Sequence, residues 1–219
     1  MEDINILGIG GYGCVFEFLE PKYKGYAGKI NLAGTPMWKE DELLDGILRS
    51  EAQFLNYQKQ ILDLDPEEKY FVPIIEIIYM DKNYPPIKKC IQKYIEKHYE
   101  SNNKRKREPE PIPEKIAVYI QRKVDVAPSV KFWSKEQLNH ALTGLKLLHS
   151  IGLAHNDVHE GNYGLKKGMP VLIDMDSAWK SNSLEIKSFQ SGYSLKTWGS
   201  SFQDMVAFKR MLDRAFDKN

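Results

Sequence analysis

Cysteine is scarce in this sequence, and the scarcity limits the class of protein. The chain has 219 residues and only two cysteines, Cys14 and Cys90. Two cysteines cannot form a disulfide framework, and no metal-ligand spacing exists between them. A reducing, intracellular compartment is therefore the expected location.

Long apolar runs and a surplus of one charge are also missing. No apolar run approaches the ~18 residues of a membrane span, and the first residues lack the basic segment and apolar core of a signal peptide. We therefore expect no membrane partner. Lys and Arg number 31 and Asp and Glu 30, which argues against nucleic-acid binding driven by bulk charge.

A set of polar residues does point to chemistry. His155 to Asn162 reads H-x-D-x-x-x-x-N, and Asp174 follows the apolar run 171–173. Asp157 can accept a hydroxyl proton, and Asn162 with Asp174 can hold a metal ion. These are the parts that phosphoryl transfer needs.

A glycine-rich segment near the start of the chain suits the same chemistry. Residues 8–16 read G-x-G-x-x-G-x-V, with strand formers on both sides of the glycines. A dinucleotide-binding fingerprint would run from strand into helix, so we expect a hairpin tip. Glycine lets backbone amides approach phosphates without a clashing Cβ.

The next segments supply a cation and a carboxylate. Residues 26–30 form an expected strand that contains Lys29. Residues from about 35 to 62 show a helical pattern with Thr35 as N-cap and room for a short break near Gly46. Glu51 falls on an apolar stripe of that pattern, with leucines 44, 48, 55 and 62 and Gln58. A buried carboxylate needs a cationic partner, and we expect Lys29 to be that partner.

Together these parts resemble the protein-kinase-like superfamily over most of the chain. The resemblance implies an α+β fold of two lobes. The N-lobe, residues 1–122, would be β-rich with one main helix and an insertion at about 81–114. The C-lobe, residues 123–219, would be a reduced helical lobe. Short strands are expected at 70–80 and 115–121, and a hinge at 121–125.

The resemblance also implies roles for individual residues. Asp157, Lys29 and Glu51 would be catalytic, and Asn162 and Asp174 would bind Mg²⁺. ATP would contact the glycine-rich segment, Lys29 and the surroundings of the adenine ring; these residues are Gly8, Ile9, Gly10, Gly11, Tyr12, Gly13, Val15, Ala27, Ile120 and Gln121. His155 would be structural.

The insertion has two parts. Residues 87–99 have the pattern of a short helix, and a later run, Lys104–Arg107, is basic. Such a run can act as a nuclear localisation patch or bind phosphate, but a solvated loop is the favoured interpretation. The insertion is expected to be peripheral to the chemistry.

The last third of the chain carries two predicted helices. One begins at Ser134, which is the N-cap of a capping box completed by Gln137. The other covers 202–212 and contains Asp204, which the resemblance assigns to the backbone amides of the catalytic loop; a solvated surface Asp is the alternative. Few residues follow, which resembles minimal, atypical or viral-type kinases working in the cytoplasm or host-cell cytoplasm.

The acceptor stays open at this stage. Transfer of the γ-phosphoryl group of ATP to Ser or Thr of a protein is the leading hypothesis. His159 stands where Ser/Thr kinases usually carry Lys, which favours a small-molecule kinase instead. A pseudokinase that binds partners without chemistry is the third alternative.

Overall fold

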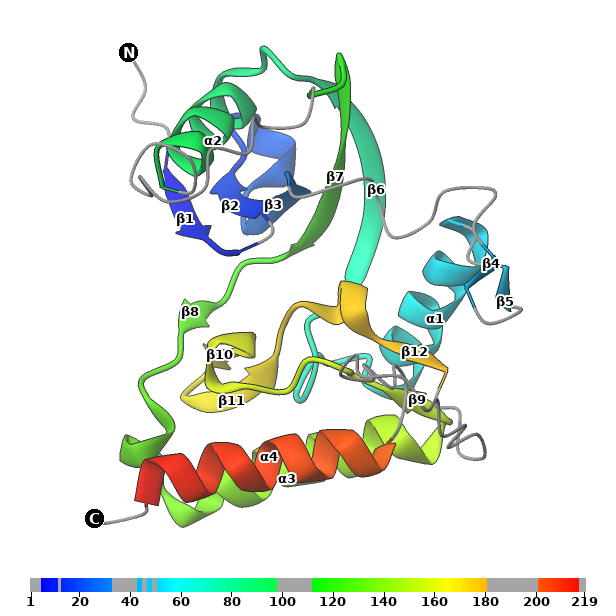
Figure 1. Cartoon of the computed structure of the whole chain (residues 1–219), viewed down its shortest axis with the longest axis vertical. Helices are drawn as coiled ribbons and strands as arrows, with labels where there is room; N and C mark the ends of the chain where they lie inside the picture. The colour runs from blue at the N-terminus through cyan, green and yellow to red at the C-terminus, as the bar shows by residue number, and fades with distance from the viewer. Residues whose placement is uncertain are drawn as a thin grey trace, which may run out of the picture. The chain divides into compact units, whose positions relative to one another are not determined.

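The structure, a computed structural model, describes residues 5–11, 13–32, 43–44, 47–48, 51–97, 112–180 and 201–216. The chain divides into two compact units (Figure 1). Unit 1 comprises residues 1–55 and 74–123, and unit 2 comprises residues 56–73 and 124–219. The fold is mixed α+β, as predicted, and each unit is described separately below.

Unit 1 is built on one antiparallel sheet of five strands in the order β1-β2-β3-β7-β6. The strands are β1 (Ile6–Ile9), β2 (Gly13–Glu17), β3 (Tyr26–Asn31), β6 (Ile74–Asp81) and β7 (Lys115–Arg122). The predicted hairpin at the glycine-rich segment and the predicted strands near 26–30 and 115–121 are confirmed.

The two faces of this sheet carry different side chains, because successive residues of a strand point to opposite faces. On one face, Phe16, Ile30 and Val118 are fully buried beneath helix α2 (Pro85–Ile95), together with Ile87 of that helix. Val15 is paired with Lys29, and Lys29 with Tyr119, so these three residues share the other face.

Helix α1 begins later than the sequence predicts. It covers Glu51–Leu64, while Leu43–Leu44 (β4) and Ile47–Leu48 (β5) pair as short antiparallel strands, so the helical pattern over these residues is wrong. The intervening Asp-Gly sequence favours a two-residue hairpin turn. Thr35, the expected N-cap, lies outside the described residues.

The buried stripe of α1 also differs from the expected one. Phe54, Tyr57, Gln58 and Ile61 are buried, whereas Glu51 and Leu55 are only partly buried. The buried residues of α1 still follow one another at helical spacings of three and four. Compared with the expected stripe, however, the buried face of the helix is shifted by about one residue. The aromatic rings of Phe54 and Tyr57 bury more apolar surface than the leucines on the expected stripe.

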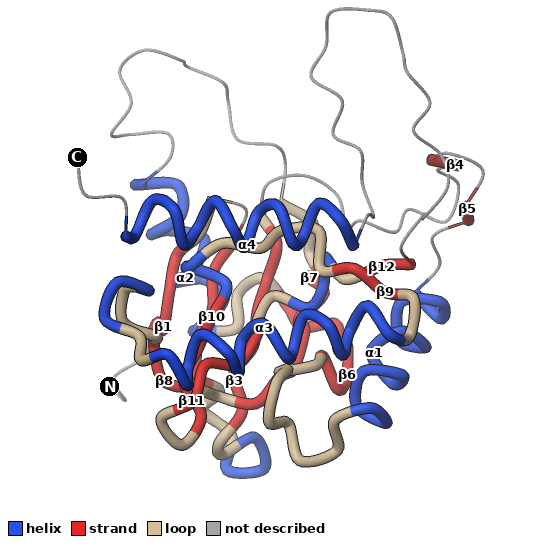
Figure 2. The backbone as a smooth tube through the Cα atoms, turned by 90° about the horizontal axis from the view of Figure 1, so that it is seen from below, coloured by secondary structure: helices blue, strands red, loops and turns tan. Residues whose placement is uncertain are grey.

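Unit 2 contains helices α3 (Lys135–Ser150) and α4 (Ser201–Phe216), which pack against each other (Figure 2). The capping box of α3 is confirmed: Gln137 N–H donates to Ser134 Oγ (3.2 Å), and Ser134 N–H donates to Gln137 Oε1 (2.8 Å). Strand β10 (Tyr163–Lys166) pairs with β11 (Met169–Leu172) and β8 (Asp125–Val126), and β9 (Leu153–Ala154) pairs with β12 (Trp179–Lys180).

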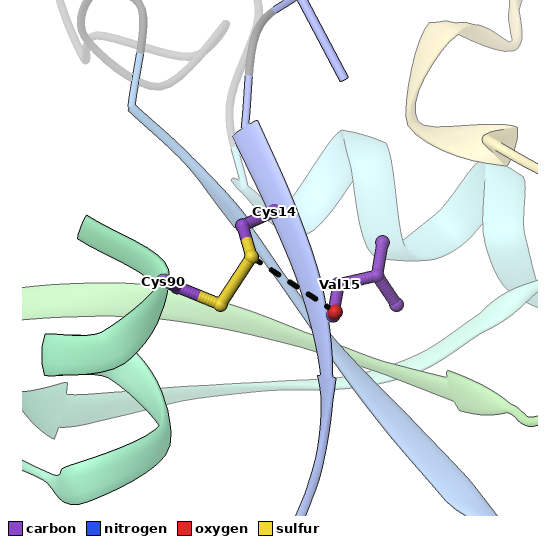
Figure 3. The surroundings of a disulfide bond; sticks show 3 residues. All are labelled: Cys14, Val15 and Cys90. Atoms are coloured by element: carbon purple, nitrogen blue, oxygen red, sulfur yellow. Dashed lines mark hydrogen bonds between the residues drawn. A yellow bond between two sulfur atoms is a disulfide. The ribbon is translucent and has the colours of Figure 1, made fainter. Parts of the chain in front are cut away.

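The two cysteines are joined. Cys14 of β2 and Cys90 of α2 form a disulfide, with their Cα atoms 5.8 Å apart and both side chains buried (Figure 3). The expectation of a reducing compartment depended on cysteine scarcity and loses that support, because disulfides persist mainly in oxidising compartments. In the described part of the chain, none of the helices has the length and apolar character to cross a membrane.

Candidate active site

The segment that follows β9 is held by a buried carboxylate. Asp204 of α4 is only 2% exposed and accepts hydrogen bonds from the backbone N–H groups of His155 (2.7 Å) and Asn156 (2.8 Å). His149 Nε2 lies 2.9 Å from the same carboxylate. The predicted role of Asp204 is therefore confirmed, and the carboxylate fixes the backbone just before Asp157.

His155 is structural, as expected. Its ring is fully buried, and Nδ1 accepts the backbone N–H of Asp157 (3.3 Å). The proton of a neutral ring must then lie on Nε2, which is 2.8 Å from the carbonyl of Ile173 and can donate to it. One imidazole thus ties the segment before Asp157 to the segment before Asp174.

Asp157 itself is accessible. Its side chain is 54% exposed, and its Oδ2 accepts a hydrogen bond from Asn162 Nδ2 (3.1 Å). His159 Nε2 lies 3.6 Å from the same oxygen. His159 Nδ1 accepts the N–H of Gly161 (3.1 Å), so Nε2 carries the ring proton and faces Asp157.

This pair of side chains influences its own titration. The imidazole of His159 is the main cause that holds the pKa of Asp157 below its usual value, with a smaller effect from Asn162. The carboxylate of Asp157 in turn raises the pKa of His159. Asp157 is consequently ionised over the whole physiological pH range and can accept a proton or a hydroxyl hydrogen bond.

Asn162 and Asp174 are brought together by the β10–β11 hairpin. Tyr163 pairs with Leu172, so the residue before β10 lies beside the residues that follow β11. The backbone confirms this, because Ile173 N–H donates to the carbonyl of Asn162 (3.0 Å). A strand hairpin of four residues a side thus joins two predicted metal ligands that are twelve positions apart.

The two side chains offer oxygen ligands. Asn162 donates its amide hydrogens to the carbonyl (2.8 Å) and carboxylate (3.1 Å) of Asp157, so the amide oxygen is the atom suited to a metal. Asp174 has left-handed backbone angles (φ 60°, ψ 39°), which non-glycine residues adopt at a cost and which cluster at functional sites. Gln58 of α1 donates to the next carbonyl, that of Met175 (2.7 Å).

These donors fit Mg²⁺ better than a metal that needs a complete protein cage. The described residues contain no cluster of three or more His, Cys, Asp or Glu side chains placed to hold a metal ion. Mg²⁺ commonly takes one or two carboxylates and completes its shell with water and substrate phosphates. One amide oxygen and one carboxylate suit that pattern.

In unit 1, the glycine-rich turn joins β1 to β2. Gly10 N–H donates to the carbonyl of Gly13 (2.9 Å) and closes the turn. A Cβ on Gly13 would collide with the carbonyl of Ile30, so packing explains that glycine. At Gly8 and Gly11, a Cβ would meet nothing within 4 Å, and neither residue has a positive φ. Tyr12 lies outside the described residues.

The predicted nucleotide residues of β2, β3 and β7 mostly share one sheet face. Val15 is paired with Lys29, and Ala27 is paired with Gln121, so all four point the same way. Ile120 does not belong to this group. It pairs with Gly28 and lies on the face beneath α2, so its predicted place behind an adenine ring is wrong by one residue.

Gln121 has a property that its sequence position did not reveal. Its side chain is 5% exposed, and among the described residues its Oε1 atom has no hydrogen-bond partner. A buried amide oxygen without a donor is costly. It lies on the face that carries Ala27 and Lys29, where a ligand with an N–H group would satisfy it.

Lys29 and Glu51, the predicted ion pair, both belong to unit 1. Lys29 is 8% exposed. The carboxylate of Glu51, at the first residue of α1, accepts a hydrogen bond from the hydroxyl of Tyr79 on β6 (2.8 Å). The sequence predicts Lys29 as the partner of Glu51. That pairing stays a prediction, because the hydrogen bond from Tyr79 uses only Oε2 of the Glu51 carboxylate. Tyr79 carries no sequence signal for it, since β6 was recognisable only as a strand.

Comparison with known proteins does not identify a family for this chain. No protein-family model matches the chain, and no curated protein matches it. The argument about function therefore depends on the residues described above.

Proposed function

We propose that this chain transfers the γ-phosphoryl group of ATP, with Mg²⁺, to a hydroxyl group, with Ser or Thr of a protein as the leading acceptor. The observation that carries the proposal is the arrangement in unit 2. An exposed, ionised Asp157 is hydrogen-bonded to Asn162, and the β10–β11 hairpin joins Asn162 to the segment of Asp174.

Asp157 would act on the acceptor. Its free carboxylate oxygen orients the acceptor hydroxyl and takes its proton as the hydroxyl oxygen attacks the γ-phosphorus. The bond from the γ-phosphorus to the bridging oxygen breaks, ADP leaves with that oxygen, and the proton passes from Asp157 to water. Since positioning and charge stabilisation supply most of the rate, the fixed backbone around Asp157 matters as much as its charge.

Asn162 and Asp174 would hold Mg²⁺ through an amide and a carboxylate oxygen. When bound, the ion neutralises negative charge on the phosphates. Asn162 would also link this group to the acceptor side, because its amide nitrogen holds the carboxylate of Asp157.

Unit 1 would bind the nucleotide. Packing within the protein does not require glycine at Gly8 or Gly11, because a Cβ there would meet nothing. Close approach of a phosphate group to the backbone would require glycine at both positions. Lys29 would contact the phosphates, and the unpartnered Oε1 of Gln121 would accept the exocyclic amino group of adenine. The five segments that the resemblance predicts as N-lobe strands form one sheet, and that sheet carries these residues. Glu51 would complete the set: Tyr79 bonds to its Oε2, which leaves Oε1 to accept from Lys29.

A small-molecule hydroxyl is the second candidate acceptor. The observation that favours it is His159, whose ring lies beside the Asp157 carboxylate at 3.6 Å, where the resemblance puts Lys in Ser/Thr kinases. Assays against separate protein and metabolite pools distinguish the two acceptors.

Nucleotide binding is the first test. A ligand that binds only the native state raises the melting temperature. At a ligand concentration 100 times Kd, the free energy of unfolding increases by about 2.7 kcal/mol. Mg-ATP should raise it, and EDTA should remove most of the increase. Asp174→Asn should weaken this response, whereas Asp213→Asn, on the exposed side of α4, should not. An unmoved melting curve at saturating Mg-ATP contradicts the proposal.

A further inference from the structure

Helix α2 makes contacts that the expected peripheral role of the insertion does not explain. Three of its residues, Cys90, Tyr94 and Lys97, are spaced by four and three positions and so lie on one side of a helix. Each is bonded to a different point of the β1–β2 hairpin. Helix α2 ends at Ile95, and the next two residues, Glu96 and Lys97, are also helical.

The three bonds surround the glycine-rich turn. Cys90 is joined by the disulfide to Cys14, the residue that follows the last glycine (Figure 3). The hydroxyl of Tyr94 donates to the carbonyl of Gly11 (2.9 Å), and the Nζ of Lys97 donates to the carbonyl of Ile9 (2.6 Å). The turn is thus held on both sides, at the end of β1 and at the start of β2.

The other end of α2 is fixed to the segment that follows β2. The hydroxyl of Tyr84, the N-cap residue, accepts the N–H of Leu19 (3.1 Å) and donates to the carboxylate of Glu20 (2.6 Å). Burial and this hydrogen bond raise the pKa of Tyr84 to about 12, so the hydroxyl remains a donor. Between the two ends, Ile87 and Cys90 are fully buried against the sheet.

A glycine-rich turn would otherwise sample many conformations. Glycine loses more backbone entropy on ordering than other residues, so a ligand that must order such a turn binds less tightly. Contacts that fix the turn beforehand remove that cost from binding. The carbonyl groups of Ile9 and Gly11 are used by α2, while Gly8 and Gly11 keep open space where a Cβ would be.

We propose that α2 is a clamp that holds the glycine-rich turn in the shape that receives nucleotide phosphates. Tyr94 and Lys97 are its positioning residues, and the Cys14–Cys90 disulfide is its covalent anchor. The phosphate part of this inference depends on the proposed function, whereas the clamping of the turn does not.

Two measurements on the full chain test it. Hydrogen exchange of the peptide that covers residues 5–17 is measured without nucleotide, and the Kd for Mg-ATP is measured by calorimetry. The test variant is Tyr94→Phe with Lys97→Met, which removes both donors and keeps side-chain size. The control is Lys93→Met, an exposed lysine of the same helix. Lys97→Arg keeps a donor and should retain most of the parental behaviour.

The clamp predicts faster exchange of this peptide in the double variant and a Kd for Mg-ATP roughly tenfold higher, as expected for the loss of two hydrogen bonds. At saturating ATP, kcat should change much less than KM. The disulfide-free variant, Cys14→Ala with Cys90→Ala, should also speed exchange of this peptide. If the disulfide only stabilised the fold, its loss would lower the melting temperature without this local effect. Parental exchange in both variants overturns the clamp.

The two proposals can fail separately. If the parent binds no Mg-ATP, the proposed function is wrong, and the exchange rates still decide whether α2 clamps the turn. If exchange becomes faster in the double variant but its Kd equals that of the parent, the link to phosphate binding is contradicted.

Discussion

The loop that carries Asp157 in unit 2 and the glycine-rich turn in unit 1 are held in different ways. A single buried carboxylate, Asp204, holds the loop through two backbone N–H groups and His149. The turn is held from outside its sheet, by α2 side chains that bond to its carbonyl groups. A buried polar network is costly to break, whereas the bonds from Tyr94 and Lys97 are part-buried and exposed and cost less to lose. Loss of the Asp204 contacts should therefore lower global stability, whereas loss of the Tyr94 and Lys97 bonds should act mainly on the turn itself.

The largest effect is expected at Asp204. Asp204→Ala leaves two backbone donors and His149 without their acceptor, and loss of one partner from such a buried group costs about 3–5 kcal/mol. Urea unfolding measures the free energy of unfolding. Asp213→Ala, which removes an exposed i,i+4 pair with Lys209, should cost no more than about 0.5 kcal/mol. Similar losses in the two variants would mean that the Asp204 contacts add no more to stability than an exposed ion pair does.

Lys29 should show the opposite balance, with a large effect on activity and a small one on stability. Lys29→Met keeps the apolar stem and removes the charge, and loss of one group that stabilises the transition state lowers the rate roughly 100-fold or more. Initial rates of phosphate transfer and thermal unfolding are compared with those of Lys24→Met, an exposed lysine of unit 1. A fully active Lys29→Met protein would exclude Lys29 from the chemistry.

The Glu51–Tyr79 contact should have a smaller effect. Tyr79→Phe removes one partly exposed hydrogen bond, so it should cost no more than about 1 kcal/mol. Glu51→Gln should keep part of the parental activity, since the amide oxygen still accepts a hydrogen bond. If Glu51→Gln is as active as the parent, the prediction that the carboxylate acts with Lys29 is wrong.

The smallest effect concerns His159. Its pKa is raised by Asp157, so the charged pair contributes stability that is fully present below the ordinary His pKa of about 6.5 and is lost as pH rises through the raised value. Both side chains are half exposed, and solvent screens the contribution. NMR titration of the ring proton should show a fall in the His159 pKa in Asp157→Asn. An unchanged pKa would mean that the ring does not interact with the carboxylate.

The sequence predicted the local features of unit 2 well. The capping box at Ser134, the buried run before Asp174 and the segment 155–162 depend on residues close together in the chain, where spacing fixes geometry. Asp204 was assigned through the resemblance to the kinase C-lobe helix, and its bonds to the N–H groups of His155 and Asn156 confirm that contact. The β10–β11 hairpin then joins Asn162 and Asp174 without any long-range contact.

Long-range pairings in unit 1 were not predictable. Cys14 and Cys90 are 76 positions apart, and a pair of cysteines carries no signal of contact. The same is true of Tyr79 with Glu51 and of Tyr94 with Gly11. The error at Ile120 has another cause: the register of β7 against β3 decides which residue shares a face with Ala27, and a one-residue slip moves every side chain to the other face.

The most direct test of the proposed function compares the parent with Asp157→Asn. Transfer of labelled γ-phosphate from ATP to separate protein and metabolite pools is measured beside the Kd for Mg-ATP. The substitution keeps the shape and removes the charge, so binding should equal that of the parent while transfer falls by roughly 100-fold to 10,000-fold. Equal transfer by both proteins, or a parent that binds Mg-ATP and transfers phosphate to neither pool, would contradict the assignment of Asp157.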